Sequence, residues 1–225
     1  MTLRICVSIL PKNNREALKL IKKSEKATAD FIEVRLDYLQ TKNLQKLAES
    51  TKIPLIATNK LVSEKGFFVG TETERQQTLL NAAKSGFEYV DVDLSSPMHI
   101  EIIGKLKQVG AKPIVSYHKY DGTLSSSEME KVLEQEIASG ANVCKIVTTA
   151  TKVEDNLGVL SFVSARKSRT KLVCFCMGKQ GTFSRFFSLM CGAFFTFASL
   201  EQGSETAIGQ MSIQSMRTLY DIFGE

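Results

Sequence analysis

Short runs rich in β-branched and aromatic residues alternate with longer helical patterns along the whole chain, and this alternation constrains the fold most strongly. The runs predicted as strands are residues 4–10, 30–36, 53–59, 89–94, 112–118, 142–148, 171–177 and 194–199. Strands that alternate with helices form parallel sheets, because a parallel connection needs a crossover segment. Eight such units in 225 residues predict an α/β protein, a single-domain (β/α)8 TIM barrel over residues 1–225. A doubly wound open sheet is the alternative.

Capping residues mark where several of the intervening helices begin and end. Thr71 stands three residues before Glu74, which is the spacing of a capping box. Ser125 and Glu128 repeat that spacing further along the chain. Glycines expected just after helix ends are Gly86, Gly110 and Gly140. The helix after the seventh strand is expected to be short, over residues 184–190.

Composition indicates an ordered globular protein. The chain is 43% hydrophobic and 24% charged, with a net charge of +5 that suits an anionic small molecule as well as it suits nucleic acid. No segment is long and apolar enough to predict a signal peptide or a membrane span, so we expect a cytoplasmic protein with no membrane partner. An odd number of cysteines, mostly in apolar runs, predicts buried thiols and no disulfide framework: Cys6, Cys144, Cys174, Cys176 and Cys191.

Ionisable residues lie inside the predicted strands, where a buried strand should carry few of them. Glu33, Arg35 and Asp37 alternate with apolar residues, so they share one face of their strand. Asp91 and Asp93 share a face in the fourth strand in the same way. A half-exposed strand with a solvated face would explain either pattern alone. In a barrel these side chains would line the interior near the carboxyl ends of the strands, where active sites of this fold lie.

Lys145 and His118 add chemistry to this group of charges. Lys145 lies in the middle of an apolar run and shares a strand face with Val143 and Val147. A desolvated lysine, or one beside another cation, loses its proton more easily and can attack a carbonyl to form an imine. His118 ends the fifth strand and is the candidate base for a proton alpha to such an imine. His99 is expected at the surface, in the first turn of a helix.

Motifs for metals and nucleotide cofactors are missing from the sequence. There is no HxH, HExxH or CxxC motif, and Cys174 and Cys176 are spaced as core residues of one strand. There is also no GxGxxG or Walker loop. The sequence therefore predicts no metal site and no cofactor.

Five segments resemble type I 3-dehydroquinate dehydratases. They are EVRLD (33–37), SYHKYDGT around His118, CKIV around Lys145, MGKQGTFSR (177–185) and IGQ ending at Gln210. The similarity runs in order from Ser8 to Gln210. The resemblance implies loss of water from 3-dehydroquinate to give 3-dehydroshikimate, a shikimate-pathway reaction that uses a lysine Schiff base and no metal or cofactor. It leaves both a biosynthetic and a catabolic role open, and it implies a homodimer.

The resemblance also implies roles for individual residues. Lys145 would form the imine, His118 would act as general acid and base, and Glu64 would orient His118. Arg185 would bind the substrate carboxylate, for which a guanidinium fork is well shaped. Gln210 would lie on a loop that closes over the site. The other positions implied to contact substrate are Ser8, Glu33, Arg35, Met177 and Phe197.

Two positions depart from the family pattern. Lys60 stands where the family usually carries a substrate-binding arginine, which keeps the charge but loses bidentate geometry. In the closing loop, Thr206 and Ile208 stand where serine and proline are common. Thr206 retains the hydroxyl, whereas the loss of proline leaves the closed loop less preset.

Two other functions remain as alternatives. A class I Schiff-base aldolase acting on a sugar phosphate uses the same lysine chemistry, but such barrels often carry a glycine-rich phosphate site near strands seven and eight. The corresponding region here offers little beyond Gly181. A nucleic-acid-binding module is disfavoured, because the lysines are scattered without aromatic residues between them.

Overall fold

The computed structural model describes residues 3–40 and 43–223, and all eight predicted strands are confirmed within these residues, with ends that shift by at most two positions. The strands are β1 (Ile5–Ile9), β2 (Phe31–Arg35), β3 (Leu55–Thr58), β4 (Tyr89–Asp93), β5 (Lys112–His118), β6 (Val143–Thr149), β7 (Leu172–Met177) and β8 (Thr196–Ala198). The third strand begins late because Pro54 has no N–H to donate to a ladder.

The strands form one parallel sheet in sequential order, β7-β6-β5-β4-β3-β2-β1-β8. β1 pairs with both β2 and β8, so the sheet curls round on itself. On the remaining side, the Phe194 N–H donates to the Leu172 carbonyl at 2.7 Å and joins the start of β7 to the chain that enters β8. The predicted (β/α)8 barrel is therefore confirmed, and the doubly wound alternative is wrong, because its strand order reverses at a central strand.

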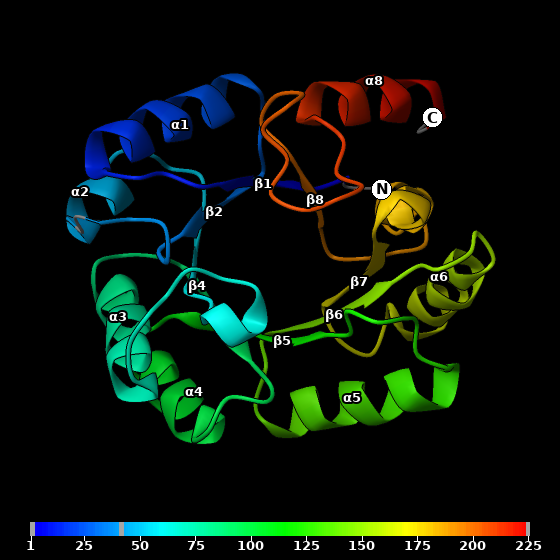
Figure 1. Cartoon of the computed structure of the whole chain (residues 1–225), viewed down its shortest axis with the longest axis horizontal. Helices are drawn as coiled ribbons and strands as arrows, with labels where there is room; N and C mark the ends of the chain where they lie inside the picture. The colour runs from blue at the N-terminus through cyan, green and yellow to red at the C-terminus, as the bar shows by residue number, and fades with distance from the viewer. Residues whose placement is uncertain (1–2, 41–42, 224–225) are drawn as a thin grey trace.

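Helices surround this ring of strands (Figure 1). In the described residues they are α1 (Asn14–Lys26), α2 (Leu44–Ala48), α3 (Glu72–Lys84), α4 (His99–Gln108), α5 (Ser126–Ala138), α6 (Asp155–Arg166), α7 (Thr182–Phe187) and α8 (Ile213–Phe223), with short 3-10 turns η1 (Val62–Glu64) and η2 (Lys179–Gly181). None of these described helices is long and apolar enough to cross a membrane.

The caps predicted for α3, α4 and α5 are confirmed, and the short helix expected over residues 184–190 is found as α7, which begins and ends two to three residues earlier. Thr71 accepts a hydrogen bond from the Glu74 amide, and Ser125 accepts one from the Glu128 amide, which completes both capping boxes. The glycines after α3, α4 and α5 have φ values of 103°, 83° and 89°, a region that residues with a Cβ rarely adopt: Gly86, Gly110 and Gly140.

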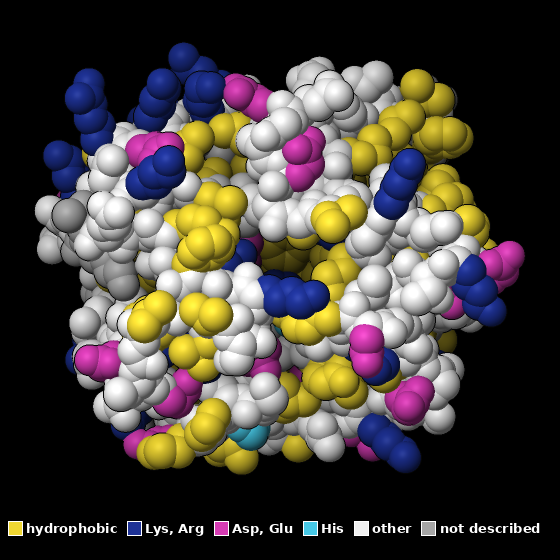
Figure 2. All heavy atoms as spheres, viewed as in Figure 1, with side chains coloured by type: hydrophobic (Ala, Val, Ile, Leu, Met, Phe, Trp, Pro, Cys, Tyr) yellow, Lys and Arg dark blue, Asp and Glu magenta, His cyan; other side chains and the backbone are white. Residues whose placement is uncertain are grey.

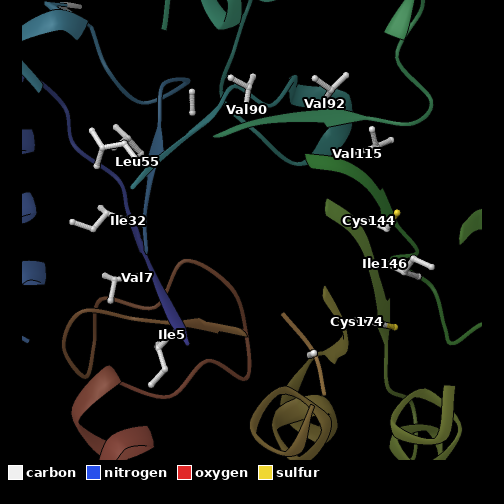
Figure 3. Close-up of a cluster of buried hydrophobic side chains, with 14 of the residues drawn as sticks. Ile5, Val7, Ile32, Leu55, Val90, Val92, Val115, Cys144, Ile146 and Cys174 are labelled. Carbon is white, nitrogen blue, oxygen red and sulfur yellow. The ribbon is translucent and has the colours of Figure 1, made fainter. Parts of the chain in front are cut away.

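The apolar side chains form two layers, one outside and one inside the ring. The outer layer fills the space between strands and helices, and Figure 3 shows Val7, Ile32, Val90 and Ile146 pointing outward into it. The inner layer fills the barrel with residues such as Cys6, Phe31, Ile56, Tyr89, Ile114, Val143, Val173 and Phe195. The five cysteines, all within the described residues, are free, and every one except the half-buried Cys191 is buried, as predicted. Because the inner layer plugs the amino-terminal part of the barrel, polar side chains gather toward the carboxyl ends of the strands.

Candidate active site

A cavity of about 520 Å³ opens at the carboxyl ends of the strands. Figure 2 shows a hollow near the centre of this face, with apolar and basic side chains at its rim. Side chains from β2, β3, β5, β6, β7, β8 and α7, and from the loops after β3 and β8, form its wall: Glu33, Arg35, Thr58, Lys60, His118, Lys145, Val147, Phe175, Met177, Arg185, Phe197, Thr206, Ala207 and Gln210. Most of the residues singled out from the sequence therefore meet in one place.

Lys145 points into the interior of the barrel, as its spacing from Val143 and Val147 predicted. The residue is only 5% exposed, and its ammonium Nζ lies 2.9 Å from Asp91 Oδ2. It also lies 3.9 Å from Glu33 Oε1 and 4.6 Å from the centre of the Phe197 ring. The amine is thus held against carboxylates on one side and an aromatic ring on another.

Lys60 belongs to the same charge network. Its Nζ lies 3.2 Å from Asp93 Oδ2, 3.4 Å from Asp91 Oδ1 and 3.4 Å from Ser116 Oγ. Burial alone would lower the pKa of Lys60, but the two neighbouring carboxylates outweigh burial and raise it. Burial would likewise raise the pKa of Asp91, but Lys145 and Lys60 together lower it. Lys60 and the two acids therefore stay charged.

His118 lies at the edge of this network. Its Nδ1 is 3.9 Å from Asp93 Oδ2 and has no hydrogen-bond partner among the described residues. Burial, followed by the positive charges of Lys60 and Lys145, lowers the pKa of His118 well below its ordinary value. The imidazole is therefore neutral and able to accept a proton near neutral pH.

Glu64 lies beside the cavity, where its carboxylate is bonded to a neighbouring amide and to an arginine. Its Oε2 accepts hydrogen bonds from the Leu61 amide at 3.3 Å and from Arg75 Nη1 at 3.4 Å. Burial raises the pKa of Glu64 despite the opposing effects of Lys60 and Arg75. The carboxylate of Asp93, which the sequence did not single out for this contact, faces the imidazole instead.

Arg185 is buried in the cavity wall, and no acidic side chain in the described part of the chain pairs with it. The residue is 2% exposed, and its guanidinium carbon lies 4.3 Å from the centre of the Phe175 ring. Its Nε has no hydrogen-bond partner in the described part of the chain, and burial lowers its pKa to about 10. A buried guanidinium left unpaired in this way is suited to receive an anion.

Glu33 and Arg35 line the cavity with different partners. Glu33 accepts hydrogen bonds from Ser8 Oγ, and from Thr58 Oγ1 at 2.8 Å. Ser8 therefore contacts Glu33 and is not itself among the residues that line the cavity. Arg35 pairs with Asp37 through two bonds of 2.9 and 2.6 Å, which leaves its remaining N–H groups for the cavity.

The loop between β8 and α8 covers one side of the opening. Thr206 donates through its amide to Gln210 Oε1 at 2.7 Å. The Gly178 amide, next to Met177 at the end of β7, donates to the Ile208 carbonyl at 3.1 Å, so the loop is joined to the barrel rim. The loop is therefore docked over the cavity although Ile208 replaces the proline common in the family.

Sequence reasoning missed several residues at this site. Val147, Phe175 and Ala207 line the cavity, and only their strand or loop position indicated it. Tyr120 donates through its hydroxyl to the Glu64 carbonyl at 3.0 Å, which links the loops after β3 and β5. The other histidine is remote from this set, since His99 contacts the Ser96 carbonyl and Ser139.

Within the described residues, no group of three or more histidine, cysteine, aspartate or glutamate side chains is arranged to hold a metal ion. The carboxylates nearest the cavity are instead engaged by lysines, arginines and hydroxyls. The cavity presents an amine, an imidazole and a guanidinium.

Fold and site together define a (β/α)8-barrel protein with a buried lysine and a buried arginine in one cavity at the carboxyl ends of its strands. A family model described as type I 3-dehydroquinase matches residues 5–225. A curated relative named 3-dehydroquinate dehydratase, from Dehalococcoides mccartyi, is 35% identical over 216 residues, which cover 96% of this chain and 94% of that protein. The chain belongs to the type I 3-dehydroquinase family, a family of lyases.

Solved structures agree on the fold. A 3-dehydroquinate dehydratase from Geobacillus kaustophilus has a TM-score of 0.91 at 22% identity, with 100% of this chain and 92% of that chain covered. A deoxyribose phosphate aldolase from Aeropyrum pernix has a TM-score of 0.65 at 13% identity, with 96% and 90% covered. The aldolase likeness is one of fold alone, so the aldolase alternative gains no support from it.

Proposed function

We propose that this chain removes water from 3-dehydroquinate to give 3-dehydroshikimate through an imine on Lys145. The observation that carries the proposal is the presence of Arg185, buried and unpaired, in the same cavity as Lys145 and His118. The substrate has a carboxylate and a ketone, which this set of side chains matches. The relatives' names supply the identity of the substrate.

Lys145 is the proposed nucleophile. Its neutral amine attacks the ketone, and the carbinolamine then loses water to form an iminium. The iminium withdraws electrons from the adjacent carbon, so a proton there becomes removable at neutral pH. The ring of Phe197, 4.6 Å from Nζ, forms an apolar side to the reacting carbon.

His118 is the proposed general acid and base. Its lowered pKa keeps the imidazole neutral well below pH 6.5, so it can take the alpha proton over the physiological range. The resulting enamine expels the beta hydroxyl, to which protonated His118 donates a proton. Water then hydrolyses the product imine and restores Lys145. Glu64 is proposed to orient His118, which requires its carboxylate to turn from Arg75 when substrate binds.

The remaining proposed contacts fix the substrate in the cavity. Arg185 pairs with the carboxylate through its guanidinium fork. Glu33, Arg35, Lys60, Thr206 and Gln210 present polar groups to the ring hydroxyls, Ser8 supports Glu33, and Met177 and Phe197 supply apolar walls. The docked loop after β8 excludes bulk water from the iminium.

The cellular setting is also a proposal. The chain is proposed to act in the shikimate pathway of aromatic amino acid biosynthesis, in the cytoplasm, as a homodimer without nucleic-acid or membrane partners. The family and the absence of a spanning helix among the described residues support this setting. Sedimentation of the purified chain would test the dimer.

A direct assay tests the proposed reaction. The product contains a conjugated double bond, so its formation is followed by ultraviolet absorbance. Lys145→Met should abolish turnover of 3-dehydroquinate, whereas Lys84→Met, at an exposed position on α3, should leave it unchanged. Cleavage of a sugar phosphate without turnover of 3-dehydroquinate would favour an aldolase. Salt-dependent retention on DNA without turnover would favour a binding module.

A further inference from the structure

Lys145 faces a group of charged and ionisable side chains. The ionisable side chains that face it from the surrounding elements are Cys6, Glu33, Lys60, Asp91, Asp93 and His118. Burial raises the pKa of the Cys6 thiol, which stays neutral. Asp91 at 2.9 Å and Glu33 at 3.9 Å place two carboxylates beside the Lys145 amine, and nearby carboxylates favour the ammonium form of an amine. An ammonium has no lone pair with which to attack a carbonyl.

Asp91 divides its two oxygens between two lysines. Oδ2 lies 2.9 Å from Lys145 Nζ, and Oδ1 lies 3.4 Å from Lys60 Nζ. Oδ1 also accepts a hydrogen bond from Ser116 Oγ at 2.8 Å. Both lysines are buried, at 5% and 6% exposure, so water screens this arrangement weakly. Asp91 therefore interacts with both lysines at once, and Lys60 offsets part of the attraction between Asp91 and Lys145.

We propose that Lys60 sets the protonation of Lys145, because its cation draws on Asp91 and opposes a second positive charge in the same buried site. Lys60 is in this respect a positioning residue that acts through Asp91, in addition to any contact with substrate. This proposal rests on the proposed function, in which the neutral amine of Lys145 is the nucleophile.

Asp93 determines how strongly Lys60 acts. Its Oδ2 lies 3.2 Å from Lys60 Nζ, and its Oδ1 accepts hydrogen bonds from the Ser95 amide at 3.0 Å and the Ser95 hydroxyl at 2.6 Å. Asp93 thus keeps Lys60 charged and offsets part of that charge. Removing Lys60 leaves Lys145 as the lysine beside Asp91, so the carboxylates attract it more strongly. Removing the negative charge of Asp93 leaves the positive charge of Lys60 less neutralised, so Lys60 repels a charged Lys145 more strongly. The two changes should shift the pKa of Lys145 in opposite directions.

The test measures the titration of Lys145 in the free, full-length protein. Trace labelling with acetic anhydride across about pH 6 to 11, followed by mass spectrometry of the peptides, gives the neutral fraction of each lysine. The exposed Lys84 provides an internal reference. Lys60→Met should raise the pKa of Lys145 by about 1–2 pH units, the order expected when one nearby unit charge is removed at an effective dielectric of ~20. Asp93→Asn should lower it.

Controls separate this effect from a loss of structure. Lys60→Arg keeps the positive charge and should leave the pKa of Lys145 within about 0.5 pH units of the wild-type value. A general loosening of the site would shift the Lys60→Met and Asp93→Asn variants in the same direction, and that result would overturn the proposal. An unchanged titration in Lys60→Met would overturn it as well. Because no substrate is used, failure of the chain to dehydrate 3-dehydroquinate would count against the proposed function only.

Discussion

Arg185 is the residue whose environment is hardest to explain without a ligand. A guanidinium that is 2% exposed and lacks an acidic partner costs folding free energy, because burial removes its hydration. Its position over the Phe175 ring repays only part of this cost. Binding of an anionic ligand would offset the rest of the cost, and Arg185 lines the same cavity as Lys145 and His118.

Replacement of Arg185 should separate function from stability. Arg185→Met should lower kcat/KM for 3-dehydroquinate by about 10²–10³-fold, since it removes charge-assisted hydrogen bonds worth about 1.5–3 kcal/mol each. The same change should raise the free energy of unfolding of the unliganded protein by about 1 kcal/mol, because an unpaired buried charge is removed. Steady-state kinetics and urea denaturation measure the two effects.

Arg185→Lys is the matched control. It keeps the positive charge but loses the bidentate guanidinium, so its kcat/KM should lie between that of the wild-type protein and that of Arg185→Met. A methionine variant that is both less stable and fully active would show that Arg185 is structural.

Residue-level sequence reasoning found the charges but not all of their partners. The alternation of side chains along a strand correctly predicted that Lys145 and Asp91 face the barrel interior, because side-chain direction in a strand depends only on local geometry. The contact of Asp91 with two lysines could not be predicted, since it depends on the relative stagger of β3, β4 and β6. The contact of Glu64 with Arg75 likewise depends on how α3 packs against the loop after β3.

At the scale of elements, the loop between β8 and α8 decides whether the cavity is closed. The Ile208 carbonyl accepts from the Gly178 amide, and the Gly209 carbonyl accepts from Thr182 Oγ1 at 3.1 Å. Gly209 has a φ of 85°, and a Cβ added there would lie 2.2 Å from the Gly178 carbonyl oxygen. The close approach of two backbone segments therefore requires a glycine at this position.

Gly209→Ala should lift the loop from the rim of the barrel. We expect kcat/KM to fall by about tenfold or more, because water reaches the iminium and Gln210 is displaced. Gly203→Ala is a matched control in the same loop, since Gly203 also has a positive φ of 87° but an added Cβ would meet no atom within 4 Å. Kinetics and limited proteolysis of the loop should distinguish the two. Equal effects would show that backbone strain matters and the contact with Gly178 does not.

The order of the elements was the part of the fold most open to prediction. Strands buried on both faces read as continuous apolar runs, and β7 is a six-residue example with mostly buried side chains. Strand eight is shorter than expected because Phe194 and Phe195 lie before it. Their rings instead pack against Phe31 inside the barrel. This tertiary contact could not be predicted from the neighbouring sequence.

For the whole molecule, one buried acid makes stability depend on pH. Glu136 on α5 is fully buried, and neither carboxylate oxygen has a well-formed hydrogen bond among the described residues. Burial, followed by the charge of Asp91, raises its pKa well above the ordinary value of 4.5. The folded state then holds this proton more tightly than the unfolded state does. Glu136 therefore costs no ionisation energy below about pH 4.5 and destabilises the fold progressively as pH rises above that value.

Glu136→Met should stabilise the protein, because it fills the same space without polar atoms. The free energy of unfolding should rise by about 1–3 kcal/mol at about pH 8 and by less at about pH 4.5. Glu136→Gln should flatten the pH dependence with a smaller gain, since the amide does not ionise but still lacks partners. Urea denaturation as a function of pH gives these values. A methionine variant that is less stable at the higher pH would show that Glu136 has a stabilising partner.

The central claim concerns a covalent bond between the substrate and one lysine, and trapping that bond tests it most directly. The protein is incubated with 3-dehydroquinate, the imine is reduced with borohydride, and the peptides are analysed by mass spectrometry. The account predicts a stable adduct on the peptide that contains Lys145 and no such adduct in Lys145→Met. Turnover of 3-dehydroquinate without an adduct on that peptide, or with the adduct on another lysine, would contradict it.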